Sequence, residues 1–378
     1  MSIGRPIVAE TVRRRVAEDP AVVAHPDGPA RLAAVRAAVA RAVREEGVLL
    51  PAAELGQVVR QLTDAFAGLG PLEPLLRMSD VTDVMVNGPE EVWIERAGQL
   101  ERTDVVFPDA EALAATVLRV LGPLGLRLDR ARPFVDARLA DGSRLHALLP
   151  PIAPDGPVVT IRRFAPVALR WEELADSNAI PDEPAAILRA AVAERRAMFC
   201  CGRTGTGKTT LLGLLMDDVT AAERVVVVED ASELRPRCPH VVRLEPRPPN
   251  ADGAGEVTLR ELVRQALRMR PDRIVVGEVR GVELVDVMQA LATGHEGCMS
   301  TVHARAADEA LVRLEGMALL AGLPLDAARA QLEVCLDLLV VLGRSGDGAR
   351  GVTEIAEVVP REDGGRLRTR NLWRRDSW

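Results

Sequence analysis

The sequence predicts an α/β chain with two domains, in which a smaller α+β domain precedes a domain built on a mainly parallel sheet. After residue 185, continuous apolar runs alternate with helical patterns, which is typical of parallel strands covered on both faces. Between residues 80 and 164, short alternating runs are separated by turn signals. A glycine-rich segment at 202–209 joins a buried apolar run to a helical pattern. At 378 residues, the chain is long enough for two separate cores.

The amino-acid composition limits the classes of function that the protein can have. The formal net charge is −7, so no chain-wide basic field indicates nucleic acid. Only 2% of residues are aromatic, so the cores must consist of Leu, Val, Ile and Ala. The chain has no signal-peptide pattern and no run of 18 apolar residues, so we expect a soluble, cytoplasmic protein that can work peripherally at a membrane. Five scattered cysteines without a C-x-x-C pair indicate reduced structural thiols.

The first part of the chain is predicted to be partly irregular. Residues 1–29 show no sustained periodicity and are expected to form a mobile arm. Helical spacing of apolar residues follows at 30–46 and 52–66. The predicted divisions are a mobile arm at 1–29, a helical segment at 30–68, an α+β domain at 69–165, a linker at 166–184, the parallel-sheet domain at 185–360 and a basic, frayed tail at 361–378.

Turn signals organise the α+β domain. Asn87-Gly88-Pro89 and Ala97-Gly98 lie between short apolar runs and predict hairpins. The predicted elements are strands at 84–86 and 92–95 and after 98, a helix at 109–121, and strands at 135–139, 144–149 and 158–164. In the second domain, the predicted strands are 197–201, 224–228, 273–276, 298–302 and 338–342.

The segment at 202–209 fits the phosphate-binding pattern G-x-x-x-x-G-K-[ST], between a strand and a helix. Backbone N–H groups at a helix start form an anion site, so the loop predicts a nucleoside triphosphate. The chain has 47 arginines and one lysine, Lys208, at the position where a compact charge must meet the β- and γ-phosphates. The candidate nucleotide-binding residues are Gly202, Thr204, Gly205, Thr206, Gly207, Lys208, Thr209 and Thr210.

Carboxylates follow two predicted parallel strands. Glu229 comes after the strand at 224–228, and Glu278 after the strand at 273–276. Because ligands bind at the carboxyl ends of such strands, both acids are candidates for the catalytic base and for orienting the water shell of Mg²⁺. Thr209 is the candidate direct Mg²⁺ ligand. The sequence does not show which of the two acids is the catalytic base and which orients the water shell of Mg²⁺.

Further charged residues lie near the same predicted sheet edge. Arg280 follows Glu278 by two residues, and His303 ends the next strand. Two histidines, His295 and His303, flank that strand, but no cysteine or carboxylate spacing completes a metal site. Contact between His303 and the terminal phosphate is the favoured interpretation.

Four segments in order carry a family resemblance: 202–209, 228–234, 267–280 and 293–304. They resemble the Walker A, Asp box, Walker B and His box of the secretion traffic ATPases of bacterial type II and type IV systems. The tight-adherence pilus assembly ATPases form the most similar branch. Arg203 departs from the family pattern, which commonly has a small residue early in the loop.

The resemblance implies a homohexameric ATPase that uses ATP and Mg²⁺, with an N-terminal domain hinged to a RecA-like P-loop domain. It also implies inner-membrane platform proteins of a pilus or secretion system as partners. Arg144 and Arg162 match positions from which N-terminal arginines reach the phosphates in similar proteins. Such arginines would neutralise charge on the γ-phosphoryl group.

Other functions remain open. One is a subunit that senses ATP with little hydrolysis, and another is an ATPase of a conjugation or DNA-transfer machine. A GTPase is disfavoured because its base-reading motif needs a second lysine. The transported substrate and the direction of transport are not encoded in any recognisable motif.

Overall fold

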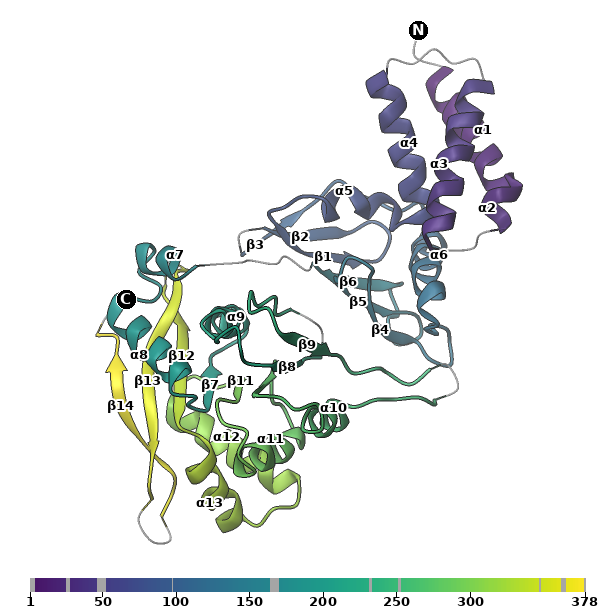
Figure 1. Cartoon of the computed structure of the whole chain (residues 1–378). Coiled ribbons are helices and arrows are strands. Elements are labelled where there is room, and N and C mark those ends of the chain that lie inside the picture. The colour runs from purple at the N-terminus through teal and green to yellow at the C-terminus, as the bar shows by residue number, and fades with distance from the viewer. Residues whose placement is uncertain are drawn as a thin grey trace. The chain divides into compact units, whose positions relative to one another are not determined.

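The chain forms two compact units, which we call the N-terminal and C-terminal units. The N-terminal unit comprises Met1–Ala165 with Asn250–Ala254, and the C-terminal unit comprises Pro166–Pro249 with Gly255–Trp378. The structure, a computed structural model shown in Figure 1, describes residues 4–24, 28–45, 52–96, 98–163, 170–230, 233–250, 253–346, 348–361 and 365–376.

The N-terminal unit begins with helices that pack around their own apolar cluster. Its helices are α1 Gly4–Glu18, α2 Pro20–Ala24, α3 Gly28–Glu45 and α4 Ala52–Ala67. The expectation of a mobile arm over residues 1–29 was wrong where the structure describes them. Val12 and Val16 lie one helical turn apart on α1 and are buried with Val35 and Val39 of α3. Burial against α3 therefore stabilises a helix that shows only a weak apolar stripe.

The rest of the N-terminal unit is a six-stranded antiparallel sheet with the strand order β3-β2-β1-β6-β5-β4. Val84, Val86 and Ile161 alternate along their strands and face a core that includes Leu113 and Val117 of α6. The predicted turn at 87–89 joins β1 to β2, with Gly88 at φ +78°. The elements are η1 Gly70–Leu72, α5 Glu73–Leu76, β1 Val81–Asn87, β2 Val92–Arg96, β3 Gln99–Arg102, α6 Ala110–Leu121, η2 Gly122–Leu124, β4 Phe134–Arg138, β5 Arg144–Leu148 and β6 Val158–Arg162.

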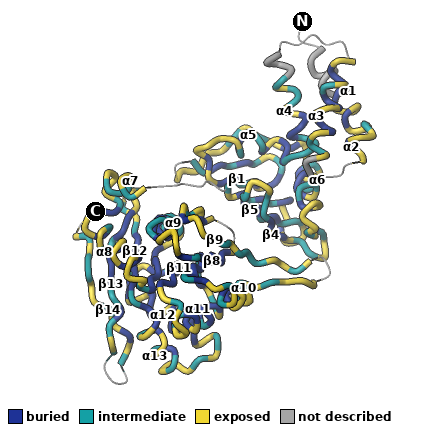
Figure 2. The backbone as a smooth tube through the Cα atoms, in the orientation of Figure 1, coloured by how far each residue is buried: buried dark blue, intermediate teal, exposed yellow. Residues whose placement is uncertain are grey.

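The C-terminal unit is an eight-stranded sheet with the order β14-β13-β12-β7-β11-β10-β8-β9. Its strands are β7 Met198–Cys201, β8 Val225–Val228, β9 Val241–Leu244, β10 Arg273–Val276, β11 Met299–Val302, β12 Leu338–Arg344, β13 Arg350–Val359 and β14 Arg368–Arg374. The strands from β12 to β9 run parallel, and every residue of β7, β8, β10 and β11 is buried (Figure 2).

Helices cover both faces of this sheet, as continuous apolar strands require. They are α7 Trp171–Asp176, α8 Asp182–Ala193, α9 Lys208–Asp217, α10 Leu259–Ala266, α11 Glu283–Ala292, α12 Ala307–Leu320 and α13 Leu325–Cys335. Apolar side chains of α8 and α9 share one core cluster with alternate sheet residues, while α10 to α13 share the other. The predicted linker at 166–184 contains α7 and the first turn of α8, and its residues 166–169 lie outside the described residues.

Residues Arg368–Arg374 near the end of the chain form strand β14, so the expectation of a frayed tail was wrong for the described residues. Strand β14 pairs antiparallel with β13, from Glu354 opposite Arg374 to Val359 opposite Arg368. Beyond it, the Arg375 guanidinium donates to the carbonyls of Asn178 and Ala179, each at 3.0 Å. Pairing with a neighbouring strand therefore holds a segment that looks polar in sequence.

Across the part of the chain that the structure describes, no helix is both long enough and apolar enough to cross a membrane.

Candidate nucleotide site

The segment at 202–209 forms a tight loop between β7 and α9, and its glycines are structurally required. A Cβ on Gly202 would lie 2.4 Å from Thr206 Oγ1 and 2.9 Å from the Leu342 carbonyl oxygen. Gly205 and Gly207 have φ angles of +74° and +94°, which favour glycine. The loop therefore delivers Lys208 to the first position of α9, where helix N–H groups lack partners within the helix.

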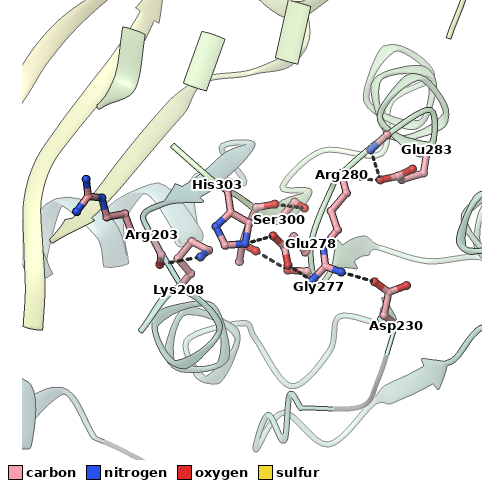
Figure 3. Close-up of polar contacts among 11 residues, drawn as sticks. Arg203, Lys208, Asp230, Gly277, Glu278, Arg280, Glu283, Ser300 and His303 are labelled. Atoms are coloured by element: carbon pink, nitrogen blue, oxygen red, sulfur yellow. Dashed lines mark hydrogen bonds and ion pairs between the residues drawn. The ribbon is translucent and has the colours of Figure 1, made fainter. Parts of the chain in front are cut away.

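Lys208 is largely buried, and its ammonium group contacts the loop itself. Nζ donates to the Arg203 carbonyl oxygen at 3.1 Å, and Thr206 Oγ1 donates to the same oxygen at 2.8 Å. Burial lowers the pKa of Lys208, while the negative charge of Glu278 acts in the opposite direction. The Arg203 side chain is exposed and points away from Glu278 and His303 (Figure 3). Only the backbone of Arg203 therefore interacts with Lys208.

Glu278 lies between His303 and Arg280 (Figure 3), and its negative charge acts on Lys208. His303 Nε2 is 2.7 Å from Glu278 Oε1, and an Arg280 guanidinium nitrogen donates to Glu278 Oε2 at 2.5 Å. Arg280 also lies 3.5 Å from Asp230 Oδ2, so it bridges acids that follow two neighbouring strands. The bond to Glu278 raises the pKa of Arg280. Glu278 Oε2 therefore accepts from Arg280, whereas the buried Oε1 lies close to His303 but has no hydrogen-bond partner among the described residues.

The pKa of the His303 ring lies below its ordinary value. Burial lowers its pKa, and the positive charge of Lys208 lowers it further. Sequence analysis favoured contact between His303 and a terminal phosphate. In the structure, Nε2 lies against Glu278, so this nitrogen can reach a phosphate only if the pair opens.

The bend after Glu278 is fixed by a residue that sequence analysis did not identify. Glu283 Oε1, at the start of α11, accepts hydrogen bonds from the backbone nitrogens of Arg280 at 2.5 Å and Gly281 at 2.8 Å. The acid thereby satisfies backbone N–H groups of the loop that precedes α11, and it also fixes the backbone from which the Arg280 side chain extends. In the sequence, the signal for this role of Glu283 is an acidic residue in the first turn of a helix.

Glu229 has a different environment from Glu278. Its carboxylate is buried and accepts backbone N–H bonds from Glu233 at 3.2 Å and Leu234 at 3.1 Å. A Cβ on Gly277 would lie 2.8 Å from Glu229 Cγ, so the absence of a side chain at 277 makes room for this acid. Desolvation by burial raises the pKa of Glu229 to about 7. The contacts of Glu229 are thus with its own loop and Gly277.

The buried carboxyl of Glu229 predicts a pH-dependent stability. Its folded pKa of about 7 lies above the ordinary 4.5, so the stability that its protonation provides is complete below pH 4.5. That stability is lost as the pH rises through about 7. We expect the free energy of unfolding of wild type to fall relative to Glu229→Gln by about 2–3 kcal/mol between pH 4.5 and pH 8.

Urea unfolding at several pH values measures this difference. Glu172→Gln, which changes an exposed acid on α7, is the matched control and should track wild type at every pH. If the free energies of unfolding of wild type and Glu229→Gln instead changed in parallel with pH across the range, burial of the charged Glu229 carboxylate would have no energetic cost.

Arg144 and Arg162 lie in the N-terminal unit. They are directly opposed on the neighbouring strands β5 and β6. Arg162 Nε donates to Asp83 Oδ1 at 3.0 Å across to β1. The two like charges of this cross-strand pair repel each other, and the Asp83 carboxylate offsets part of the repulsion.

The structure brings some of the predicted residues together within the C-terminal unit. Lys208, Glu278, Arg280 and His303 form one electrostatic cluster, whereas Glu229 lies across Gly277 with its carboxylate bonded elsewhere. Thr209 and Thr210 are half-buried in the first turn of α9. Sequence analysis had also not identified Thr301, whose hydroxyl donates to the Gly277 carbonyl at 2.8 Å.

The donor set fits an ATP-bound Mg²⁺ ion better than a metal centre formed by protein ligands alone. Among the residues that the structure describes, no group of three or more His, Cys, Asp or Glu side chains could hold a metal ion. Mg²⁺ in nucleotide sites takes few protein ligands and completes its shell with phosphate oxygens and water. A single hydroxyl ligand at Thr209 with nearby acids suits that arrangement.

Comparisons with known proteins show which family the chain resembles over most of its length. The family model described as "Type II/IV secretion system protein" matches residues 65–344. A Mycobacterium tuberculosis protein, whose name describes it provisionally as a conjugal transfer protein, is 44% identical over 324 residues, covering 84% of this chain and 92% of the relative. The type IV secretion system protein PtlH of Bordetella pertussis is 35% identical, covering 75% and 91% of the two chains.

A solved structure, that of the Legionella pneumophila ATPase DotB, matches with a TM-score of 0.54 and 21% identity. The match covers 77% of this chain and 80% of that chain. At this identity, the likeness bears on the fold alone. It confirms the predicted fold class: a P-loop ATPase fold of the RecA-like type with a smaller α+β domain and a short helical segment before it. The match to the family model confirms the predicted family as a whole and does not distinguish its branches.

Proposed function

Because the chain belongs to the type II/IV secretion system protein family, we propose that it is an ATP-hydrolysing motor for transport across or assembly at a membrane. The observation that carries the proposal is the cluster of Lys208, Glu278 and His303 beside a phosphate-binding loop. In our proposal, hydrolysis of ATP drives a domain movement that is transmitted to partner proteins.

The proposed binding step uses residues 202–210. Backbone N–H groups of the loop and of the first turn of α9 would bind the phosphates. Lys208 would exchange the Arg203 carbonyl oxygen for oxygens of the β- and γ-phosphates, because phosphate is a far stronger partner for an ammonium group. Thr209 would hold Mg²⁺, which when bound neutralises charge on the phosphate oxygens.

The proposed chemical step places Glu278 as the general base. Its carboxylate would accept the proton of the water that attacks the γ-phosphorus, while Arg280 holds the other carboxylate oxygen. The bond between the γ-phosphorus and the oxygen bridging to the β-phosphate would break, and ADP would leave. The alternative base is Glu229, but both of its oxygens already accept backbone N–H bonds. We therefore assign Glu229 to shaping the loop that follows β8, and to orienting the water shell of the metal only if that loop rearranges.

Arg144 and Arg162 are proposed to stabilise charge that develops on the γ-phosphoryl group. Their direct opposition on β5 and β6 supports an anion-binding role. We expect Arg144→Ala to lower kcat by about 10–100-fold, in line with the loss of one electrostatic contact to the transition state. The exposed Arg102→Ala on β3 is the matched control in the same sheet. Equal rates for the two variants would contradict the role of Arg144.

We propose a homohexameric ring at the cytoplasmic face of the inner membrane, with platform proteins of a pilus or secretion system as partners. The ordered motifs support the tight-adherence pilus branch as the first candidate. A machine for DNA transfer is the second, because a relative with 44% identity carries a conjugal transfer name. Salt-dependent binding of DNA by the purified chain would favour the second candidate.

Phosphate release by the full-length wild type with ATP and Mg²⁺, with and without lipid vesicles, tests the proposed activity. A motor should release phosphate measurably faster than Glu278→Gln under at least one condition. Equal, negligible rates for the two proteins would contradict hydrolysis and leave a subunit that senses ATP.

A further inference from the structure

We infer that Thr301 is a positioning residue for hydrolysis, which acts through the backbone of Gly277 and Val279 to hold the bend that carries Glu278. The inference rests on the proposed function. Thr301 lies on β11, immediately before the last residue of that strand, and is 1% exposed. Among the described residues, no hydrogen bond joins Thr301 to Glu278, whereas Thr301 does bond to the backbone on both sides of it.

Thr301 bonds to the chain on both sides of Glu278. Its hydroxyl donates to the Gly277 carbonyl oxygen at 2.8 Å, and its own carbonyl oxygen accepts from the Val279 nitrogen at 2.9 Å. The first bond uses the side chain and the second uses only the backbone. Replacing Thr301 by a residue without a hydroxyl therefore removes the first bond and leaves the second available.

The bond to Gly277 matters because the chain leaves the sheet at this residue. Strand β10 ends at Val276, which pairs with Val228 of β8 and Ser300 of β11. Gly277 still donates its N–H to the Val228 carbonyl at 2.8 Å, after which the chain turns toward α11. The hydroxyl of Thr301 then holds the first carbonyl beyond the end of the strand.

Strand alternation places Glu229, Gly277 and Thr301 in one row across β8, β10 and β11. Alternate residues of these strands, including Val227, belong to the core cluster on the face that α8 and α9 cover. Because Gly277 has no side chain, Glu229 occupies the space above its Cα. Gly277 is thus confined by Glu229 on one side and bonded by Thr301 on the other.

Loss of the hydroxyl would leave the Gly277 carbonyl without this donor in a buried site. Such a group tends to move toward a new partner or water, because an unsatisfied buried acceptor is costly. Movement of the bend would shift Glu278 relative to His303 and the attacking water. A misplacement of about 1 Å can cost roughly a hundredfold in rate. The nucleotide contacts of residues 202–209 lie on other elements and should be little affected.

Thr301→Val and Thr301→Ser in the full-length chain test the inference. Valine keeps the shape but not the hydroxyl, and serine keeps the hydroxyl but not the methyl group. Thr116→Val is the matched control, because Thr116 is buried in the N-terminal unit and its hydroxyl donates to the Ala112 carbonyl at 2.9 Å. For each variant, kcat and KM for ATP, binding of ADP and the thermal midpoint are measured.

We expect Thr301→Val to lower kcat about 10–100-fold, with KM and ADP affinity within about twofold of wild type. Thr301→Ser should recover kcat to within about threefold, and Thr116→Val should match wild type. A folded Thr301→Val with wild-type kcat would overturn the inference and leave the proposed function intact.

Other outcomes also separate the two proposals. A loss in Thr301→Ser as large as that in Thr301→Val would assign the effect to packing and overturn the positioning role. A rise in KM or a loss of ADP binding with unchanged kcat would assign Thr301 to binding, which also overturns it. Absence of hydrolysis by the wild type would instead contradict the proposed function.

Discussion

Lys208→Ala is expected to reduce the rate of phosphate release from ATP by at least on the order of 10²–10³-fold. Lys208 is the only lysine in the chain and starts α9 at the end of the phosphate-binding loop. Its ammonium group bonds to a backbone carbonyl in the structure, and the other cationic side chain of the loop, that of Arg203, points away from Glu278 and His303. Alanine removes this charge while preserving the helix, since alanine is a good helix former.

Two further variants make the Lys208 experiment specific. Lys208→Arg keeps the charge but spreads it over a planar group, so we expect it to recover little activity. Arg374→Ala removes one exposed positive charge from the edge strand β14 and should leave the rate unchanged. Steady-state phosphate release and equilibrium binding of a fluorescent ATP analogue measure the effects. Hydrolysis by Lys208→Ala at the wild-type rate would show that the loop does not bind the reacting phosphates.

Glu278→Gln is expected to lower kcat by about 10²–10⁴-fold while ATP still binds. Glutamine has nearly the shape of glutamate and can accept the hydrogen bond from Arg280, but it cannot take a proton from water. The variant should therefore accumulate the ATP-bound state. Glu172→Gln, which neutralises an exposed acid on α7, is the control for the change in charge.

Single-turnover measurements separate the chemical step from nucleotide binding and release. If Glu278→Gln binds ATP with wild-type affinity and hydrolyses it slowly, the role of general base is supported. If Glu278→Gln hydrolyses ATP normally and Glu229→Gln does not, the two acids have been assigned the wrong roles. The second result would also require the loop after β8 to release the Glu229 carboxylate from Glu233 and Leu234.

Local sequence patterns were enough to predict the phosphate-binding loop and the buried strands around it. The loop is encoded by glycines whose positions the structure explains through positive φ angles and close contacts, as at Gly202 and Gly207. Strands β7 and β8 are short and wholly apolar, and β10 is apolar after its first residue, Arg273, so their pattern does not depend on distant partners. Both kinds of signal arise within a few residues of the feature they specify.

The different environments of Glu229 and Glu278 could not be predicted in the same way. Each acid follows an apolar strand, and the two local patterns are alike. Tertiary contacts distinguish the two acids. Glu229 contacts backbone N–H groups of the following loop and lies over the Cα of Gly277, which has no side chain. Glu278 contacts His303 and Arg280. These contacts depend on strand order, which the sequence pattern left open.

Tertiary contacts also explain the errors at the two ends of the chain. Helix α1 carries three consecutive arginines beside its buried valines, and the helix is stabilised by packing against α3. Strand β14 is rich in arginine and half-exposed, as an edge strand often is, and pairing with β13 organises it. Segments that depend on a partner element give weak signals when read alone.

The most direct measurement is an experimental structure of the full-length chain with a non-hydrolysable ATP analogue and Mg²⁺. Our account predicts that Lys208 Nζ has left the Arg203 carbonyl and contacts the β- and γ-phosphates, with Glu278 facing the terminal phosphate. An analogue bound away from residues 202–209, or bound there while Lys208 still contacts Arg203, would contradict it.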